Sequence, residues 1–304
     1  MEAAEVEEAL KVLDASLTHI KWRLKSSSKR RLQIDVLAVC TEMRPVVMID
    51  YGGKMPELQE NLCAFLEHSQ KVSPIFEQLR VMVIEDMIYL IHVKEMAKYV
   101  SSSLSSEVEL LFVDLDQDPP KMRTLDDKNL LGMQLISIQK LFSLYFPLEG
   151  MRSDLLPADW TELQGNSKSL SEPIDSRSSL LMDLSSCMHD TEITVPTING
   201  WLLGYPVVYL FSKDHIGDAI YNLSTKFLRI YKILVSRKST PNKGSQPEEL
   251  MSFSVPYELS MRGSNEPWAE MFLAGLQSKW GRSKQTWSSL EMEVTECYPQ
   301  AIAL

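Results

Sequence analysis

The amino-acid sequence predicts an α/β protein, with a mostly parallel sheet flanked by helices and a mixed or antiparallel C-terminal part. In the first half of the chain, short continuous apolar runs alternate with stretches of helical periodicity. Such runs are typical of strands buried on both faces, and their alternation with helices is typical of a parallel sheet. In the last third, alternating apolar and polar residues instead indicate half-buried strands.

Composition limits the classes of protein to which the chain can belong. It has 304 residues, of which 41 are acidic and 31 are basic, and 44% are hydrophobic. These values are typical of soluble globular proteins and exclude collagen-like, fully disordered and coiled-coil chains. The net charge of −10 argues against non-specific nucleic-acid binding, because an acidic surface repels the phosphate backbone. The most apolar stretch, 200–211, is too short for a transmembrane helix and contains Pro206.

Two amphipathic helices are expected at the N-terminus. Apolar residues recur at spacings of three and four over 10–24 and again over 32–43, and serines at 26–28 separate the two stretches. Pro45 prevents continuation of the second helix. We therefore treat 1–31, an amphipathic helix followed by a basic linker, as an N-terminal unit.

The first half of the α/β core is expected over 32–148. It contains apolar runs that we interpret as buried strands and that are separated by helical stretches. The expected strands are 46–50, 81–84, 88–91 and 108–114, and the expected helices begin near Pro56, Lys94 and Leu130.

The second half of the same core domain is expected over 194–304, after a polar, flexible excursion at 149–193 in which no periodicity persists. Residues 198–211 are expected to be extended chain with a bend at 204–206. Strands are expected at 251–255 and 290–297, and a helix is expected to begin at Pro267. Residues 227–235 are either a strand or a helix, and their branched and aromatic side chains favour a strand.

The cysteine pattern indicates a reducing compartment. The four cysteines, Cys40, Cys63, Cys187 and Cys297, lie far apart and form no CxxC pair, and the acidic N-terminus is unlike a secretory signal. We expect free thiols, no disulfides and an intracellular, cytoplasmic location, with the nucleus as the alternative.

Acidic residues follow several of the expected strands: Asp50, Glu85, Asp86, Asp114 and Asp116. In open α/β sheets, ligands bind beyond the carboxyl ends of parallel strands, and carboxylates gathered there could hold Mg²⁺ together with a phosphate. Two glycines after Asp50 would let the backbone approach that phosphate closely. The candidate metal or phosphate site is therefore Asp50, Gly52, Gly53, Asp114 and Asp116.

A simpler interpretation of these acids is more frequent, because acids after strands often cap the next helix and stay solvated. No GxxxxGK[ST] or GxGxxG loop is present to support nucleotide binding. The HExxH and GxSxG motifs of zinc proteases and serine hydrolases are also absent.

A second candidate pocket combines His92, Tyr205 and Tyr209. His92 follows an apolar strand, and the conformationally restricted residues 204–206 could place both tyrosines at a pocket wall. The structural alternatives, which we favour, are an ordinary strand-end histidine and a bent core strand.

Residues 21–31 carry six basic side chains and no acidic one. Such a run could serve nuclear import or contact an anionic membrane or nucleic acid. The alternative, which we favour, is a solvated helix face, because helix ends commonly collect basic residues.

Three blocks in the last third resemble one protein family: 202–209 (Leu-Leu-Gly-Tyr-Pro-Val-Val-Tyr), 252–256 (Ser-Phe-Ser-Val-Pro) and the ending 293–304. The run 45–50 resembles the first buried strand of the same family. It is a family of animal proteins known only as the product of an open reading frame, and the resemblance spans roughly 32–304, with 149–192 poorly matched. It implies a coherent evolutionary unit and brings no activity, substrate or catalytic residue.

Two functions from different classes are therefore open, and the sequence does not decide whether the chain is an enzyme. The first, which we favour, is a non-catalytic interaction with a protein partner, since no recognisable catalytic set is present and the polar excursion is suited to transient contacts. The alternative is a Mg²⁺-dependent phosphohydrolase or nucleotide-binding enzyme that uses the acids at strand ends. No cofactor is evident apart from the Mg²⁺ of this alternative.

Overall fold

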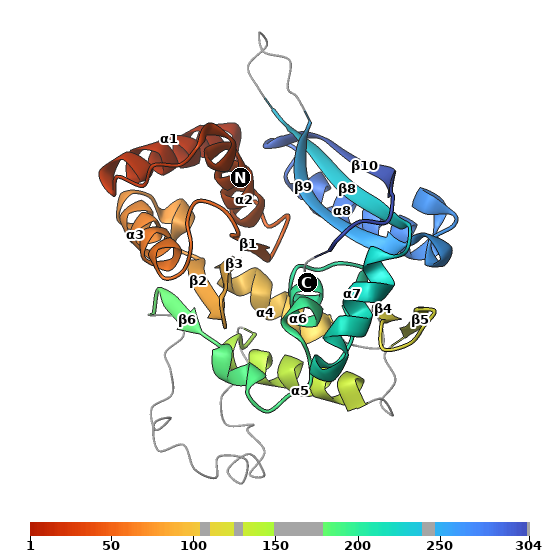
Figure 1. Ribbon diagram of the computed structural model, residues 1–304. Coiled ribbons are helices and arrows are strands. Elements are labelled where there is room, and N and C mark those ends of the chain that lie inside the picture. Colours follow the sequence, from red (N-terminus) through yellow and green to blue (C-terminus); the bar gives the residue numbers. More distant parts are fainter. Residues whose placement is uncertain (104–109, 125–129, 149–178, 239–246, 303–304) are drawn as a thin grey trace.

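A computed structural model of the protein describes residues 1–103, 110–124, 130–148, 179–238 and 247–302 (Figure 1). Most of the expected excursion at 149–193 lies outside these residues. The helices are α1 (Ala3–His19), α2 (Ser26–Cys40), α3 (Glu57–Val72), α4 (Val93–Ser102), α5 (Leu130–Tyr145), α6 (Val195–Leu202), α7 (Ile216–Ser224) and α8 (Pro267–Arg282). Short 3-10 helices are η1 (Pro74–Phe76), η4 (Ser185–Met188), η5 (Lys213–His215), η6 (Tyr257–Leu259) and η7 (Gly263–Asn265).

The described strands form three sheets, so the α/β class is confirmed at this level. The first sheet has the order β1 (Val46–Met48), β3 (Met87–His92), β2 (Leu79–Ile84) and β6 (Leu181–Asp183). The second has the order β5 (Lys121–Thr124), β4 (Leu111–Asp114) and β7 (Val207–Leu210). The third has the order β10 (Trp287–Cys297), β8 (Leu228–Arg237) and β9 (Glu248–Pro256).

The prediction of a mostly parallel sheet is wrong. Among the strand pairs of the described residues, β2–β6 and β4–β7 are parallel, and all others are antiparallel. The chain reverses between β2 and β3 through Glu85 and Asp86, where Glu85 has a φ of 52°. No glycine or asparagine marks this turn, so the usual hairpin signal is missing from the sequence. These two acids therefore form a hairpin turn between antiparallel strands, and the only described strand that runs parallel to β2 and ends beside them is the short strand β6.

The burial of the strands follows the prediction even though their directions do not. In the first sheet, Val81 and Val83 belong to the core formed with α1, α2 and α3, whereas their neighbours Met82 and Ile84 belong to the core formed with α4, α5 and α6. Helices therefore cover both faces of this sheet, which is why its strands are continuous apolar runs. β4 and β7 separate the second core from a third, which includes α7, α8 and the third sheet.

The C-terminal part is an antiparallel sheet with β8 in the middle, and its strands and the helix α8 agree with the ranges expected from the sequence. Residues 198–211 differ from the expectation, because they begin with the helix α6 before they enter β7. Pro196 lies in the first turn of α6, where a proline is well tolerated. Ile198 and Trp201 then place their side chains on one buried face.

The basic run at 21–31 contains the start of α2 and makes ion pairs with acids from other segments. Lys29 lies 2.9 Å from Asp14, and Arg30 pairs with Glu248 of β9. Within the described residues, no helix combines the length and the apolar sequence that spanning a bilayer requires. All four cysteines are free, so no disulfide forms among them.

Candidate functional site

The parallel pair β4 and β7 provides the frame of the candidate site. The register pairs Leu111 with Val207 and Asp114 with Leu210, so the two strands end at the same edge. The ladder continues for one residue, because the N–H of Leu115 donates to the carbonyl of Leu210 at 3.0 Å. This is the kind of edge at which ligands bind in α/β sheets.

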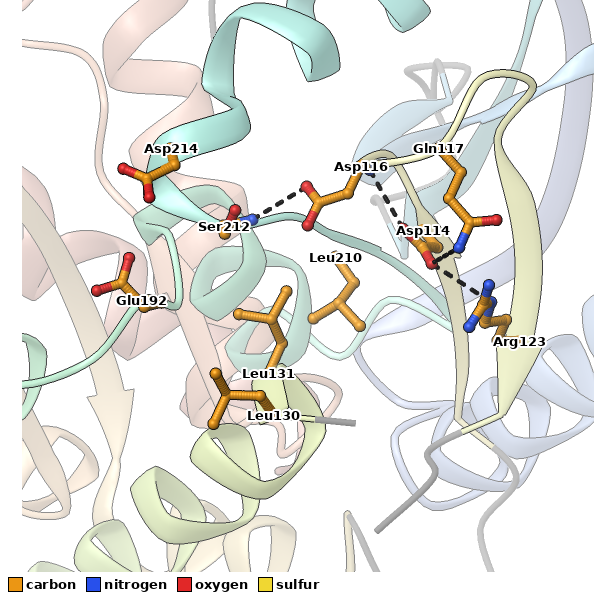
Figure 2. A pocket seen from close by; sticks show the side chains of 10 residues that line it. All are labelled: Asp114, Asp116, Gln117, Arg123, Leu130, Leu131, Glu192, Leu210, Ser212 and Asp214. Carbon is orange, nitrogen blue, oxygen red and sulfur yellow. Dashed lines mark hydrogen bonds and ion pairs between the residues drawn. The ribbon is translucent and has the colours of Figure 1, made fainter. Parts of the chain in front are cut away.

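A pocket of about 440 Å³ opens beyond this edge (Figure 2). Its lining residues come from the end of β4 and the turn after it, from β5, from the first turn of α5, from the chain before α6, and from the end of β7 with η5. They are Asp114, Asp116, Gln117, Arg123, Leu130, Leu131, Glu192, Leu210, Ser212 and Asp214. The volume lies in the range of small-ligand sites, about 300–1,000 Å³.

Asp114 is buried and surrounded by donors. Its Oδ1 accepts the backbone N–H of Asp116 at 3.2 Å, and its Oδ2 accepts the side-chain amide of Gln117 at 3.0 Å. Arg123 of β5 completes the set, with its Nε 3.3 Å from Oδ2. Both oxygens of this carboxylate are therefore already occupied, and its charge is balanced by the guanidinium of Arg123.

Asp116 joins the two strand ends. Its Oδ1 accepts the backbone N–H of Ser212 at 3.2 Å, and its Oδ2 lies 3.5 Å from Nδ1 of His215. The amide of Asn222, on α7, donates to the carbonyls of Leu115 and Gln117 at 3.0 and 3.1 Å and so holds the turn after β4 in place. The position of Asp116 is thus set by long-range contacts.

Two further carboxylates, Glu192 and Asp214, lie on the opposite side of the pocket from Asp114 and Asp116, with Leu130, Leu131 and Leu210 between the two groups (Figure 2). Gln134 of α5 accepts the backbone N–H of Glu192 at 3.0 Å and thereby positions it. Neither of these two carboxylates makes a hydrogen bond or ion pair with another described residue.

The pocket has an excess of negative charge. Four carboxylates line it against one guanidinium, and that guanidinium is paired with Asp114. Lys213, which follows Ser212 in the chain, donates its ammonium to the carbonyl of Met188 at 3.1 Å. A cation that enters the pocket would therefore meet two carboxylates, Glu192 and Asp214, that are not paired with a described basic side chain, whereas Asp116 lies 3.5 Å from Nδ1 of His215.

Ser212, His215 and Asp116 have the composition of a catalytic triad but not its geometry. The hydroxyl of Ser212 lies 2.7 Å from Nδ1 of His215, and Asp116 lies 3.5 Å from the same nitrogen. A triad needs the two partners on different ring nitrogens, so that the acid orients the ring while the other nitrogen takes the proton. This arrangement is therefore a local contact of side chains at the start of η5 and lacks the geometry of a proton relay.

Comparison with protein families gives one match, and it includes every segment on which the resemblance described above rests. The chain belongs to the family described as a domain of unknown function (DUF4504). The match extends over residues 14–304 and so includes every residue that lines the pocket. No curated protein and no solved structure matches the chain significantly.

The structure brings together two residues of the predicted metal or phosphate site, Asp114 and Asp116, and places the others elsewhere. Asp50, Gly52 and Gly53 follow β1, which belongs to another sheet, and they do not line the pocket. Among the residues that the structure describes, no group of three or more His, Cys, Asp or Glu side chains is arranged to hold a metal ion.

The glycines after Asp50 have a packing role. Gly52 has a φ of 88°, and its carbonyl accepts the indole N–H of Trp22 at 2.9 Å. A Cβ on Gly52 would lie 2.7 Å from a methyl group of Leu24. Apolar side chains from the segment between α1 and α2 thus fill the space next to Gly52, where a phosphate was expected. Both this close packing and the positive φ require glycine at this position.

The residues of the second candidate pocket do not line the pocket beyond β4 and β7. They are His92, Tyr205 and Tyr209. Tyr209 donates its hydroxyl to the carbonyl of Ser254 at 2.9 Å, and Tyr205 packs its ring 5.4 Å from that of Phe253. Both tyrosines therefore join β7 and the preceding turn to β9.

His92 is buried and acts as the N-cap of α4, where its Nδ1 accepts the backbone N–H of Glu95 at 3.3 Å. Burial lowers the pKa of His92 from its ordinary value of 6.5, although Glu42 and Glu95 act in the opposite direction. The folded state therefore binds the proton less tightly than the unfolded state, and stability is lost as the pH falls below 6.5.

This behaviour predicts a pH effect that depends on His92. Protonation of Nδ1 removes the cap, which costs about 1 kcal/mol. His92→Asn retains an acceptor at the N-cap but cannot titrate, so we expect its urea midpoint to fall less than that of the wild type between about pH 7.5 and about pH 5. Equal falls in both proteins would show that His92 does not contribute to the pH dependence.

Sequence reasoning missed Arg123, Glu192, Ser212 and Asp214. Glu192 lies at the end of a polar stretch without periodicity, where the sequence gives no sign of a site. The local signal for Ser212 and Asp214 is their position just beyond an apolar run, which is the same signal that placed Asp114 among the candidate residues.

Proposed function

We propose that this protein acts by binding another protein without catalysis, and that its pocket between β4, β7 and α5 receives an arginine or lysine side chain of the partner. The observation that carries the proposal is the charge of two carboxylates in the pocket: Glu192 and Asp214 line it without a described partner, and Arg123 is already paired with Asp114.

The apolar wall supports a long cationic side chain over a simple metal ion. Leu130, Leu131 and Leu210 line the pocket between the carboxylates. Lysine and arginine bury their methylene stems against such surfaces while their charged ends reach polar groups. A guanidinium can also bind carboxylates through two parallel hydrogen bonds, which makes arginine the better fit.

The Mg²⁺-dependent phosphohydrolase remains the second candidate, because Asp114 and Asp116 lie at the carboxyl edge of a parallel strand pair. This function requires the carboxylate of Asp114 to lose its contacts with Gln117 and Arg123 and to coordinate a metal ion instead. Mg²⁺ binds through one or two carboxylates together with water and substrate phosphate, so the requirement can be tested directly.

The binding proposal predicts a ligand preference that methyl NMR can measure. In protein labelled at leucine methyl groups, N-acetyl-arginine amide should shift the signals of Leu130, Leu131 and Leu210, whereas the neutral analogue N-acetyl-citrulline amide should not. Glu192→Gln/Asp214→Asn should weaken the binding of the arginine derivative by about three- to tenfold, because two exposed charge pairs are lost.

The matched control removes the same charge elsewhere. Glu60→Gln/Glu270→Gln changes two exposed acids outside the pocket, and we expect it to leave the arginine affinity unchanged. Equal shifts with arginine and citrulline would contradict the proposal. So would Mg²⁺-dependent hydrolysis of p-nitrophenyl phosphate that is lost in Asp116→Asn, since that result would favour the enzyme.

A further inference from the structure

The strand β10 has one edge that no other described strand occupies. The third sheet has the order β10–β8–β9, and β10 pairs with β8 alone over Trp287–Cys297 (Figure 1). The described side chains supply one hydrogen bond to its backbone from outside the sheet, from the indole of Trp280 to the carbonyl of Trp287 at the start of the strand. An unpaired strand edge of this length is a template for an added strand.

The burial of paired side chains supports an open edge. Leu290, Met292 and Val294 of β10 lie opposite Val235, Ile233 and Tyr231 of β8. The three β8 residues are fully buried, whereas their three partners on β10 are only half-buried. Because both sets share one face of the sheet, the remaining exposure of the β10 residues lies toward the unpaired edge.

The same strand carries exposed acids at alternate positions. Glu291 and Glu293 are exposed, and Glu293 lies opposite Lys232 of β8. Further along, Glu296 pairs with Arg229 of β8 at 3.6 Å. Two acids of β10, Glu293 and Glu296, thus have a basic neighbour on β8, whereas Glu291 lies opposite Leu234. A basic strand on the other side of β10 would place positive charge next to both Glu291 and Glu293.

We propose that the free edge of β10 binds an extended segment of a partner protein as an additional strand, and that this segment carries lysine or arginine at alternate positions. Main-chain hydrogen bonds to β10 provide the affinity, and the basic side chains opposite Glu291 and Glu293 provide the specificity. Apolar residues at the intervening positions of the segment cover the exposed parts of Leu290, Met292 and Val294. The proposal uses residues outside the pocket and does not depend on it.

A second copy of this chain fits the edge less well. If two β10 strands paired across a twofold axis at Met292, Glu291 of one copy would face Glu293 of the other. Like charges directly opposite each other destabilise strand pairing, and charged side chains on edge strands commonly prevent self-association.

Fluorescence anisotropy with a defined peptide tests the proposal on the full chain. The probe is the labelled, acetylated peptide Thr-Lys-Val-Lys-Val-Lys-Thr, and its counterpart has glutamate in place of lysine. We expect the basic peptide to bind and to protect amides of β10 from hydrogen exchange. Glu291→Lys/Glu293→Lys should weaken this binding by about tenfold and strengthen that of the acidic peptide by a similar factor.

Two controls separate strand addition from general attraction. Glu258→Lys/Glu270→Lys makes the same change in net charge at exposed acids outside β10, and it should bind the basic peptide nearly as the wild type does. A basic peptide that is N-methylated at every lysine and valine should bind about tenfold less tightly, since none of these five residues can donate a main-chain hydrogen bond.

Three results would overturn the proposal. Equal losses in the reversed variant and its control would mean that the attraction is non-specific. Undiminished binding of the N-methylated peptide would mean that no strand is added. A dimer in sedimentation that disappears in Glu291→Lys/Glu293→Lys would mean that a second copy occupies the edge.

Discussion

Trp201→Ala is expected to lower the free energy of unfolding by about 3–5 kcal/mol. Trp201 is fully buried in the second core, where its ring packs 5.5 Å from that of Phe142 in an edge-to-face arrangement. Its indole N–H donates to the hydroxyl of Ser103 at 2.9 Å. Truncation leaves a large cavity that the surrounding helices and strands cannot fill completely, and it removes the hydrogen bond as well.

Urea unfolding monitored by circular dichroism measures this effect, with an unchanged dependence on urea concentration taken as evidence for the same unfolded state. Trp201→Phe should lose less, because an aromatic ring remains, although Ser103 loses its donor. Tyr221→Ala serves as the control, since Tyr221 is 61% exposed and its loss should matter little. A loss below about 1 kcal/mol for Trp201→Ala would contradict the packing described for α6.

Asp35→Ala is the second substitution from which we expect a large effect, a loss of about 3 kcal/mol. The carboxylate of Asp35 is fully buried on α2 and lies 2.9 Å from the guanidinium of Arg31. It also accepts the hydroxyl proton of Tyr51 at 2.6 Å. Its removal leaves Arg31, Tyr51 and the nearby buried Arg44 without their negative partner.

Most of that loss comes from the groups left behind. Burial raises the pKa of Asp35, although Arg31, Tyr51 and Arg44 act in the opposite direction, so the ion pair itself stabilises the fold less than its contacts suggest. A double substitution, Asp35→Ala/Arg31→Met, should therefore recover part of the stability lost in Asp35→Ala. Additive losses in the double variant would mean that the two residues are not coupled.

The comparison substitution is Asp14→Ala. Asp14 is half-exposed and pairs with Lys29, so its removal should change the free energy of unfolding by less than about 1 kcal/mol. If Asp14→Ala and Asp35→Ala were equally destabilising, burial would not be the cause of the effect at Asp35. Both measurements use the urea midpoint of the full chain.

The sequence predicted the burial of the first-half strands correctly and their direction wrongly. A continuous apolar run such as 81–84 indicates that both faces of a strand are covered, and helices do cover both faces here. The run gives no information on whether the neighbouring strand is parallel or antiparallel. The reversal between β2 and β3 depends on a left-handed conformation at Glu85, for which the sequence offers no turn residue.

The helix α6 was missed for a related reason. Its residues Ile198 and Trp201 have no strong preference for helix, Gly200 disfavours it, and the apolar content of 198–211 is equally typical of a buried strand. Packing of these side chains against α4 and α5 decides the outcome. By contrast, β8 and α8 lie where they were expected, since branched and aromatic residues favoured a strand over a helix at 227–235 and Pro267 marked the start of α8.

The sequence by itself determined which segments of this protein are buried, that helices and strands alternate, and that Asp114 and Asp116 follow a strand, because these properties depend on neighbouring residues. Only the tertiary structure decided that Glu192 and Asp214 share a pocket with them, and that Asp50 lies elsewhere. Strand order and direction depend on turns and on packing between distant segments, and the identity of the residues at a sheet edge depends on both.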